Sequence, residues 1–216
     1  MQGNTIVTAL VAAAGLASSS HAAIFTGVTS LRTAQTAYAP AGGSLVFTGP
    51  SDTGFASWFG NSTLFQPGMY AFASQGSELT STTLSAVGET FVSTATAANR
   101  AASRSSIDFI FTLDEAATVT IFAQAGGNFG SRTAMQVYLG TANEAIINAS
   151  SGFTTFSDVS LAAGTYILSA SVLTDVDGVA ASANGFYNIS ISVPAPGALA
   201  AFGLAGLAGT RGRGRR

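Results

Sequence analysis

The sequence contains no cysteine and no lysine, and its only histidine is His21. Without cysteine there is no disulfide framework, no catalytic thiol and no thiolate metal site. His21 lies in an N-terminal segment that we expect to be removed, and its loss would exclude Ser-His-Asp hydrolysis and histidine-based zinc sites. The lack of disulfides does not exclude export, because a chain of 216 residues can bury a sufficient core without them.

Charge is also scarce. Only 8% of the residues are charged and 47% are hydrophobic, which excludes a charge-rich disordered chain. Residues 23–192 contain ten carboxylates and four arginines, which gives this segment a net charge of −6. The arginines are Arg32, Arg100, Arg104 and Arg132. An acidic body argues against nucleic-acid binding, which usually needs a basic face.

Residues 1–22 have the pattern of a secretory signal peptide, which we expect to be helical. An apolar run from Ile6 to Ala17 is followed by Ser20-His21-Ala22, which places small residues at the −3 and −1 positions. This predicts cleavage between Ala22 and Ala23. One departure from the usual pattern is that no Lys or Arg precedes the apolar run. The alternative is a buried helix of the fold.

Residues 23–192 show the period-2 alternation of an all-β protein, which predicts a β-sandwich or jelly roll. Ile107 to Leu113 alternates, and Asp114–Ala117 is expected to be a hairpin connection to the run that follows. Tyr166 to Leu173 is typical of a central strand, and Tyr187 to Val193 closes the domain. Further inward-facing positions are predicted at Val119, Ile121, Ala123, Met135, Val137 and Leu139.

The first half of the body is less regular. Short strands are expected at 45–47, 57–59 and 69–72, between turns that contain glycine or proline. The Ser-, Thr- and Ala-rich stretch 80–104 is compatible with an edge strand and a long loop, or with a weakly ordered connector. Residues 94–103 are also compatible with a short helix.

The stretch from Leu161 to Tyr166 predicts a glycine turn followed by a strand. The Tyr166 ring should pack in the core while its hydroxyl reaches a loop carbonyl. Residues 153–166 resemble the closing half of bacterial extracellular jelly-roll modules, such as the pre-peptidase C-terminal type. The resemblance covers only this short stretch and concerns the fold rather than the function.

Only carboxylates are left for catalysis once His21 is gone. A glycosidase needs two of them at a defined separation across a cleft. Asp114 and Glu115 are adjacent, so on a strand they would point to opposite faces. Most of the others lie in expected turns, and we predict no enzyme. The full set is Asp52, Glu78, Glu89, Asp108, Asp114, Glu115, Glu144, Asp158, Asp175 and Asp177.

Two further features could bind a ligand. Asp175 and Asp177 before Gly178 resemble a fragment of a calcium loop, but Leu173 occupies the first ligand position and no closing glutamate follows. An Asp-Gly turn is the favoured interpretation, and no cofactor is predicted. Trp58, Phe59 and Phe65 could form an aromatic platform for sugar rings, but we expect them to be core residues.

The C-terminal residues 193–216 combine a proline hinge, an apolar segment and an arginine cluster. The fourteen uncharged residues 197–210 would form a helix of about 21 Å, short of the roughly 30 Å hydrocarbon core. Basic residues after an apolar run favour a cytoplasmic tail and an external body. The physical prediction is a temporary membrane stop with a cleavable hinge. The basic residues are Arg211, Arg213, Arg215 and Arg216.

The tail resembles the PEP-CTERM sorting signal that exosortases recognise in Gram-negative bacteria that make exopolysaccharide. Val193-Pro194-Ala195-Pro196-Gly197 corresponds to the motif, with Ala195 in place of its glutamate. The resemblance implies that the secretion machinery exports the chain and that the inner membrane holds it transiently. An exosortase would then cut near the two prolines and release the body to the cell surface or extracellular matrix. A buried helix or a plain tail anchor is the alternative.

These features lead to three functional hypotheses. The first is a non-enzymatic exported protein with a structural or adhesive role, in contact with extracellular polysaccharide. The second is a carbohydrate-binding module that uses exposed aromatics, and it predicts that Trp58 is exposed on a concave face. The third is a carboxylate-dependent glycosidase, which predicts two carboxyl groups about 5–10 Å apart in a cleft.

Overall fold

Twelve β-strands account for most of the residues that the structure describes. In our computed structural model, residues 23–128, 132–150 and 152–193 are described, and they contain strands but no α-helix. The all-β prediction is therefore confirmed. The expected signal-peptide helix, residues 1–22, and the expected C-terminal helix within 194–216 lie outside the described residues.

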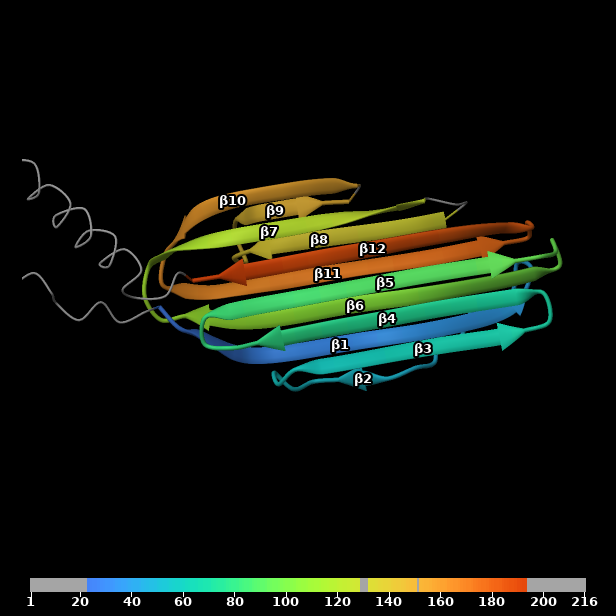
Figure 1. Cartoon of the computed structure of the whole chain (residues 1–216), viewed down its shortest axis with the longest axis horizontal. Coiled ribbons are helices and arrows are strands. Elements are labelled where there is room, and N and C mark those ends of the chain that lie inside the picture. The colour runs from blue at the N-terminus through green and yellow to red at the C-terminus, as the bar shows by residue number, and fades with distance from the viewer. Residues whose placement is uncertain (1–22, 129–131, 151, 194–216) are drawn as a thin grey trace, which may run out of the picture. The chain divides into compact units, whose positions relative to one another are not determined.

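The strands form two antiparallel sheets, each of six strands (Figure 1). Sheet A has the order β2-β1-β6-β11-β8-β9, and sheet B has the order β10-β7-β12-β5-β4-β3. The strands of sheet A are β1 Phe25–Pro40, β2 Ser51–Asp52, β6 Asn99–Leu113, β8 Arg132–Gly140, β9 Ala145–Ala149 and β11 Gly164–Asp177. Those of sheet B are β3 Trp58–Gln66, β4 Met69–Leu79, β5 Thr83–Thr94, β7 Ala117–Asn128, β10 Phe153–Leu161 and β12 Ala181–Ser192.

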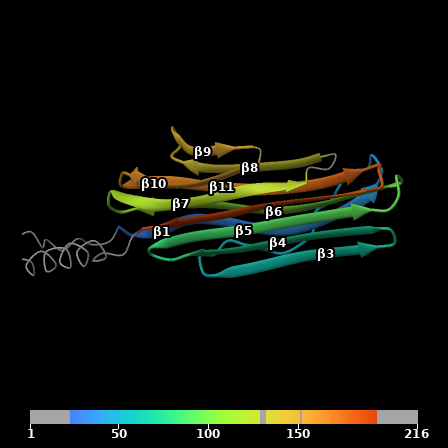
Figure 2. The ribbon, with the colours of Figure 1, turned by 45° about the horizontal axis from the view of Figure 1, so that its top comes forward.

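The two sheets pack face to face as a β-sandwich (Figure 2), and the inward side chains of both form the core. The alternating sets predicted in β6, β7, β8, β11 and β12 are all buried. Ala23 and Val193, the first and last described residues, also belong to this core. Residues 23–193 make one compact unit.

A polar layer crosses the interior and divides the core. On one side lies the large cluster around Phe109, and on the other a small one of Ala71, Val92, Ala101, Val176 and Ala183. Hydrogen bonds join the sheets between the clusters: Thr90 contacts Thr174 at 2.7 Å, and Ser105 contacts Tyr187 at 3.3 Å. These bonds satisfy groups that would otherwise be buried without a partner.

The predicted hairpin at Asp114–Ala117 is wrong. β6 belongs to sheet A and β7 to sheet B, so this connection crosses from one sheet to the other. Alternation identifies the inner face of each strand, but both sheets share one core. The inner residues of β6 and β7 therefore look alike whether the strands pair or face each other.

The first half of the chain departs most from the predictions. β1, with 16 residues, was not predicted at all. Residues 83–94 form β5, which lies between β12 and β4 inside sheet B and not at an edge. Residues 94–103 contain no helix. Residues 45–47 form no strand, and Val46 is 76% exposed.

The prediction for Tyr166 is confirmed. Its ring packs against Phe111 with centroids 5.8 Å apart, and its hydroxyl donates a hydrogen bond of 2.8 Å to the carbonyl of Ala162. Burial raises the pKa of Tyr166. Gly164 begins β11 with φ 155°, a conformation that L side chains rarely adopt. The hydrogen bond fixes the connection from β10 in sheet B to β11 in sheet A, as in a tyrosine corner.

Candidate functional site

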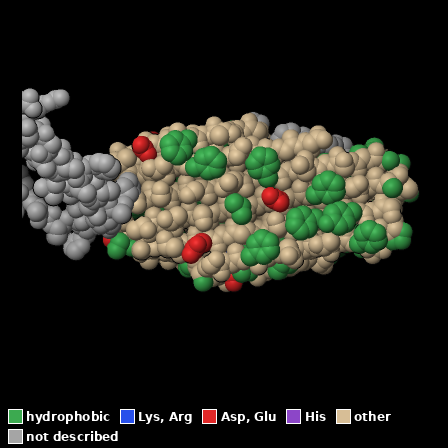
Figure 3. All heavy atoms as spheres, viewed as in Figure 1, with side chains coloured by type: hydrophobic (Ala, Val, Ile, Leu, Met, Phe, Trp, Pro, Cys, Tyr) green, Lys and Arg blue, Asp and Glu red, His purple; other side chains and the backbone are tan. Residues whose placement is uncertain are grey.

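The outer surface of sheet B carries aromatic side chains from all six of its strands. We call this surface the aromatic face (Figure 3). It is defined by Phe59 and Phe65 of β3, Tyr70 and Phe72 of β4, Phe91 of β5, Phe122 of β7, Phe156 of β10 and Phe186 of β12. Because successive residues of a strand point to opposite sides, each lies one position from an inward-facing residue. Ser, Thr, Asn and Gln side chains fill the places between the rings.

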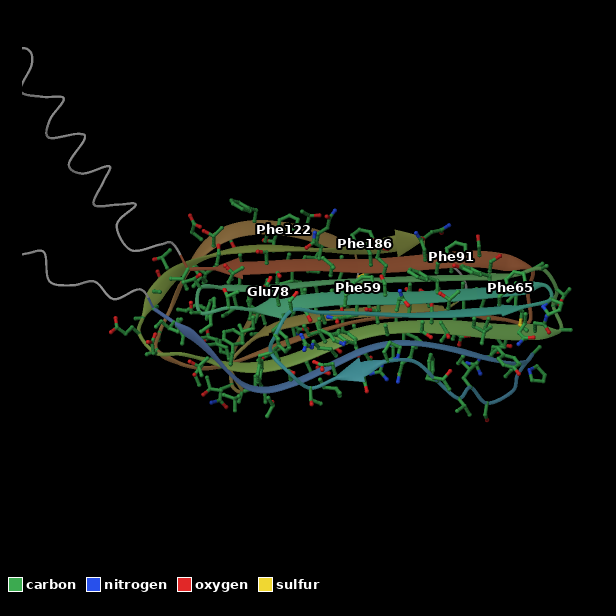
Figure 4. The ribbon with its side chains drawn as sticks, turned by 60° about the horizontal axis from the view of Figure 1, so that its bottom comes forward. Phe59, Phe65, Glu78, Phe91, Phe122 and Phe186 are labelled. Atoms are coloured by element: carbon green, nitrogen blue, oxygen red, sulfur yellow. The ribbon has the colours of Figure 1, made fainter. Side chains whose placement is uncertain are left out.

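The exposure of several of these rings is unusual for phenylalanine. Phe59 is 68% exposed, Phe65 78% and Phe156 73%. The expectation that Phe59 and Phe65 are core residues is therefore wrong. Figure 4 labels six residues at this surface, five of them phenylalanines. Large exposed apolar side chains gathered on one surface indicate an interaction site in a soluble protein.

The strand register brings the rings together in groups. Phe156 of β10 lies opposite Phe122 of β7, near one end of the aromatic face. Towards the other end, Phe72 lies opposite Phe91. Tyr70 is tilted against Phe91 with ring centroids 5.9 Å apart. Such aromatic cross-strand pairs stabilise a sheet as well as shaping its surface.

Two outward-facing glycines leave space between the rings. Gly76 of β4 lies between Phe59 and Val87, and Gly126 of β7 lies beside Phe186. One shallow depression is lined by Phe59, Gly76 and Val87, among others. Two others lie on the same surface, one beside Phe72, Phe91 and Phe186 and one beside Phe65 and Tyr70. The aromatic face is thus a nearly flat surface with small hollows rather than a cleft.

The aromatic face carries negative charge and no positive charge. The strands of sheet B contain Glu78, Glu89 and Asp158 but no Arg, Lys or His, and Figure 3 shows no basic side chain on this side of the described residues. All four arginines of residues 23–193 belong to strands of sheet A. Asp158 accepts a hydrogen bond of 2.7 Å from the Thr120 hydroxyl.

The carboxylates of the aromatic face are spread out. Glu89 lies opposite Ser74, and Glu78 is four residues further along β4. That is a separation of about 13 Å along the strand at 3.3 Å per residue. Glycosidase carboxyl groups lie roughly 5–10 Å apart across a cleft. On the outer surface of sheet A, Asp108 is exposed, as predicted, and accepts a hydrogen bond from Ser169.

The calcium candidate residues contact an arginine. Asp175 is buried and accepts two hydrogen bonds from the Arg100 guanidinium, at 3.1 and 2.6 Å. Asp177 lies 3.8 Å from Arg100 and accepts a hydrogen bond from the backbone N–H of Gly42. Within the described ranges, no group of three or more His, Cys, Asp or Glu side chains is placed to hold a metal ion.

Trp58 lies on the inner side of β3 and is only partly exposed. The Arg32 guanidinium lies 5.4 Å from its ring centre and 5.8 Å from that of Phe109, a cation–π arrangement inside the sandwich. Arg32 is 1% exposed and pairs with Asp52, whose pKa the arginine lowers. Trp58 therefore does not meet the condition set by the carbohydrate-binding hypothesis, whereas Phe59 is exposed.

Comparisons with models of known protein families and with curated proteins find no match for this chain. Among the residues that the structure describes, there is no helix long and apolar enough to cross a membrane.

Sequence reasoning identified only Phe59 and Phe65 of the aromatic face, and the signal for the others was present. Each of the remaining rings lies in the outward phase of an alternating strand. Phe122 follows the buried Ile121, and Phe186 precedes the buried Tyr187. Large apolar residues in the outward phase of several strands of one sheet indicate an interaction surface.

Proposed function

We propose that this chain is an exported, non-enzymatic adhesive protein whose aromatic face contacts neutral extracellular polysaccharide. The observation that carries the proposal is the set of aromatic rings that all six strands of sheet B place on one cation-free surface. Aromatic rings offer an apolar plane to the carbon faces of sugars, and neighbouring hydroxyl and amide groups can bond their hydroxyls.

The shape of the aromatic face favours a long polymer over a small ligand. Small-molecule sites are concave and bury most of the ligand, whereas this surface is flat with small hollows. A flat surface that spans six strands can contact several sugar units at once, each weakly. Binding should therefore increase with the length of the polysaccharide.

The charge of the aromatic face favours an uncharged polymer. Glu78, Glu89 and Asp158 would repel carboxylated or sulfated chains, and no strand of sheet B supplies a compensating cation. A neutral glycan avoids this repulsion. Removal of a charge by Glu89→Gln should leave binding to neutral glycans unchanged and increase any residual binding to anionic ones.

Binding of the full chain to a panel of neutral and anionic polysaccharides tests the proposal. We expect the double variant Phe59→Ala/Phe156→Ala to lose most of the binding to neutral polymers. The matched control, Leu31→Ala/Tyr38→Ala, removes two exposed apolar side chains of β1 in sheet A, which are 45% and 51% exposed. If both double variants lose binding equally, or if the wild type binds none of the polymers, the aromatic face is not a glycan surface.

We further propose that residues 194–216 deliver the body, by the route that the PEP-CTERM resemblance implies. These residues lie outside the described ranges, and the proposal depends on their sequence. The intact mass of the protein from the surface fraction of its host tests it. Loss of residues 1–22 and of everything after about Pro196 is expected. A mature protein that retains Arg211 to Arg216 would contradict it.

A further inference from the structure

The edges of the two sheets differ in a way that points to self-association. Sheet A ends in β2, which has two residues, and in β9, which has five residues and a register shift at Leu139/Gly140. Short strands and bulges are common protections of an open sheet edge. Sheet B ends in β3 and β10, which have nine residues each and pair with their neighbours without a register shift.

Neither long edge carries the residues that usually prevent pairing. β3 contains no charged residue and no proline, and β10 contains one charge, Asp158. No other strand of the described residues pairs with the free side of β3 or β10. Thr48, next to β3 in space, contacts the inward side chain of Ser62 and bridges to Thr36 of β1, so it does not pair with the β3 backbone. Both edges thus offer backbone N–H and C=O groups to another strand.

The topology makes the two edges complementary. All neighbours in sheet B are antiparallel, and the sheet has six strands, so β10 and β3 run in opposite directions. A second copy placed beside the first in the same orientation would therefore set its β10 antiparallel to β3. The joined sheet would keep the aromatic faces on one side.

The side chains are compatible with this arrangement when all nine residues of β3 pair with all nine residues of β10. Outward residues of β3 then lie opposite outward residues of β10, with Asn61 facing Asp158. Inward, Trp58 faces Leu161, and Gly60 faces Val159. No like charges meet, and an amide is placed against the one carboxylate. In this register the inward residues of both strands stay on the inner side of the joined sheet.

We propose that copies of this protein join through β3 of one molecule and β10 of the next, so that sheet B continues from molecule to molecule. Each contact uses β3 of one copy and β10 of the next, so a pair still has one open edge at each end and the contact does not close on itself. The product is an open-ended assembly that multiplies the aromatic face. This inference goes beyond the adhesive function and does not depend on glycan binding.

The first test uses charge at the predicted contact. In Asn61→Asp a carboxylate would face Asp158, and like charges directly opposite each other destabilise strand pairing. Sedimentation of the full chain across a concentration series should show that the wild type grows with concentration and that Asn61→Asp remains at the monomer mass of 21.6 kDa. The swap Asn61→Asp/Asp158→Asn should restore assembly, because it exchanges the two groups at unchanged net charge.

Asn188→Asp is the matched control. It makes the same substitution on the outer surface of β12, in the interior of sheet B, and should assemble like the wild type. Thermal unfolding of each variant shows whether it remains folded. A wild type that stays monomeric at every concentration would overturn the proposal, and so would a control that assembles as poorly as Asn61→Asp.

Introduced thiols give a second test that needs no loss of function. Because the chain has no cysteine, Asn61→Cys and Asp158→Cys each create a single thiol. A mixture of the two variants under oxidising conditions should yield mainly the mixed disulfide, linking β3 of one copy to β10 of another. Dominance of dimers within either variant alone, or the statistical mixture in which the mixed disulfide is only about half of the product, would exclude β3–β10 pairing. Glycan binding by the monomeric Asn61→Asp variant would show that glycan binding does not require assembly.

Discussion

The two sheets of this sandwich use polar and apolar residues in opposite ways. Sheet A carries the four arginines, pairs Arg32 with Asp52 and Arg100 with Asp175, and ends in short strands. Sheet B carries no cation, exposes aromatic rings and ends in long strands. Arg32 and Arg100 of sheet A make contacts within the molecule, whereas sheet B leaves its outer surface and edges available to other molecules.

The arginines of sheet A show what such contacts do. Arg100 bonds Asp175 and donates a 2.8 Å hydrogen bond to the carbonyl of Gly43, so it holds the loop after β1 against the sheet. On the inner side, Arg32 donates to the carbonyl of Ala56 at 2.8 Å and to the Ser77 hydroxyl at 3.3 Å. Both side chains join segments that are far apart in the chain. Nothing comparable holds a loop across the outer surface of sheet B in the described residues.

Removal of the Arg32 side chain should have the largest effect on stability among the tests of this difference between the sheets. Arg32→Ala leaves the carbonyl of Ala56 without its donor, removes the partner of Asp52 and opens a space between Trp58 and Phe109. Truncation of this fully buried side chain leaves a cavity and an unpaired carbonyl, which together cost about 3 kcal/mol or more of unfolding free energy. Urea denaturation measures the loss. Arg32→Met keeps most of the volume without the charge and should cost less. A loss below about 1 kcal/mol for Arg32→Ala would show that the pair contributes little.

The inner and outer sides of sheet B should respond differently to an added methyl group. A Cβ at Gly88 would overlap the Tyr187 ring and the Ser105 hydroxyl in the core. Gly88→Ala should therefore cost about 2 kcal/mol through overpacking. At Gly126, on the outer side, the nearest atoms belong to the Phe186 ring at 3.1 Å, and this half-buried ring has solvent on one side into which it can move. Gly126→Ala should cost clearly less in the same denaturation experiment, and equal losses would contradict the comparison.

Alkaline pH should weaken the sandwich through Tyr187. Burial raises the pKa of this tyrosine well above its ordinary value of about 10. The folded state thus keeps the proton while the unfolded state loses it, so stability is complete below pH 10 and falls as the pH rises above it. In Tyr187→Phe this fall should be reduced, at a cost of about 1 kcal/mol at neutral pH from the lost hydrogen bond. Thermal midpoints between pH 7 and about 11 check both effects. An unchanged alkaline loss in Tyr187→Phe would assign it to another group, with Tyr166→Phe as the comparison.

The residues on the inner side of a strand determine which parts the sequence could predict. Strands with large apolar residues at every second position, such as Ile107, Phe109 and Phe111 of β6, were recognised and are buried. β1 was missed because its inner positions include Arg32, Ala34 and Thr36, which do not stand out from a loop. β5 was misplaced for the same reason, since Gly88 and Thr90 occupy its inner side.

Assignment of strands to sheets was beyond the sequence pattern. Alternation shows which side of a single strand is buried. The sheet to which that strand belongs depends on contacts between distant segments of the chain. The β6–β7 connection shows this, because Leu113 and Val119 face the same core from opposite sheets. The aromatic face, in contrast, was predictable in principle, because the outward phase of each recognised strand was already fixed.

The smallest change in unfolding free energy is expected for the exposed rings of the aromatic face. Phe59 and Phe156 are 68% and 73% exposed, so their truncation removes little buried surface. Phe59→Ala and Phe156→Ala should each change the unfolding free energy by less than about 0.5 kcal/mol. Phe109→Ala, fully buried on sheet A, should cost about 3–5 kcal/mol. If the exposed rings proved as costly as Phe109, they would be needed for the fold, and loss of binding in their variants would no longer identify a surface. A near-zero cost would mean instead that these rings are not needed for the fold, so that a loss of binding in their variants identifies the aromatic face as the contact surface.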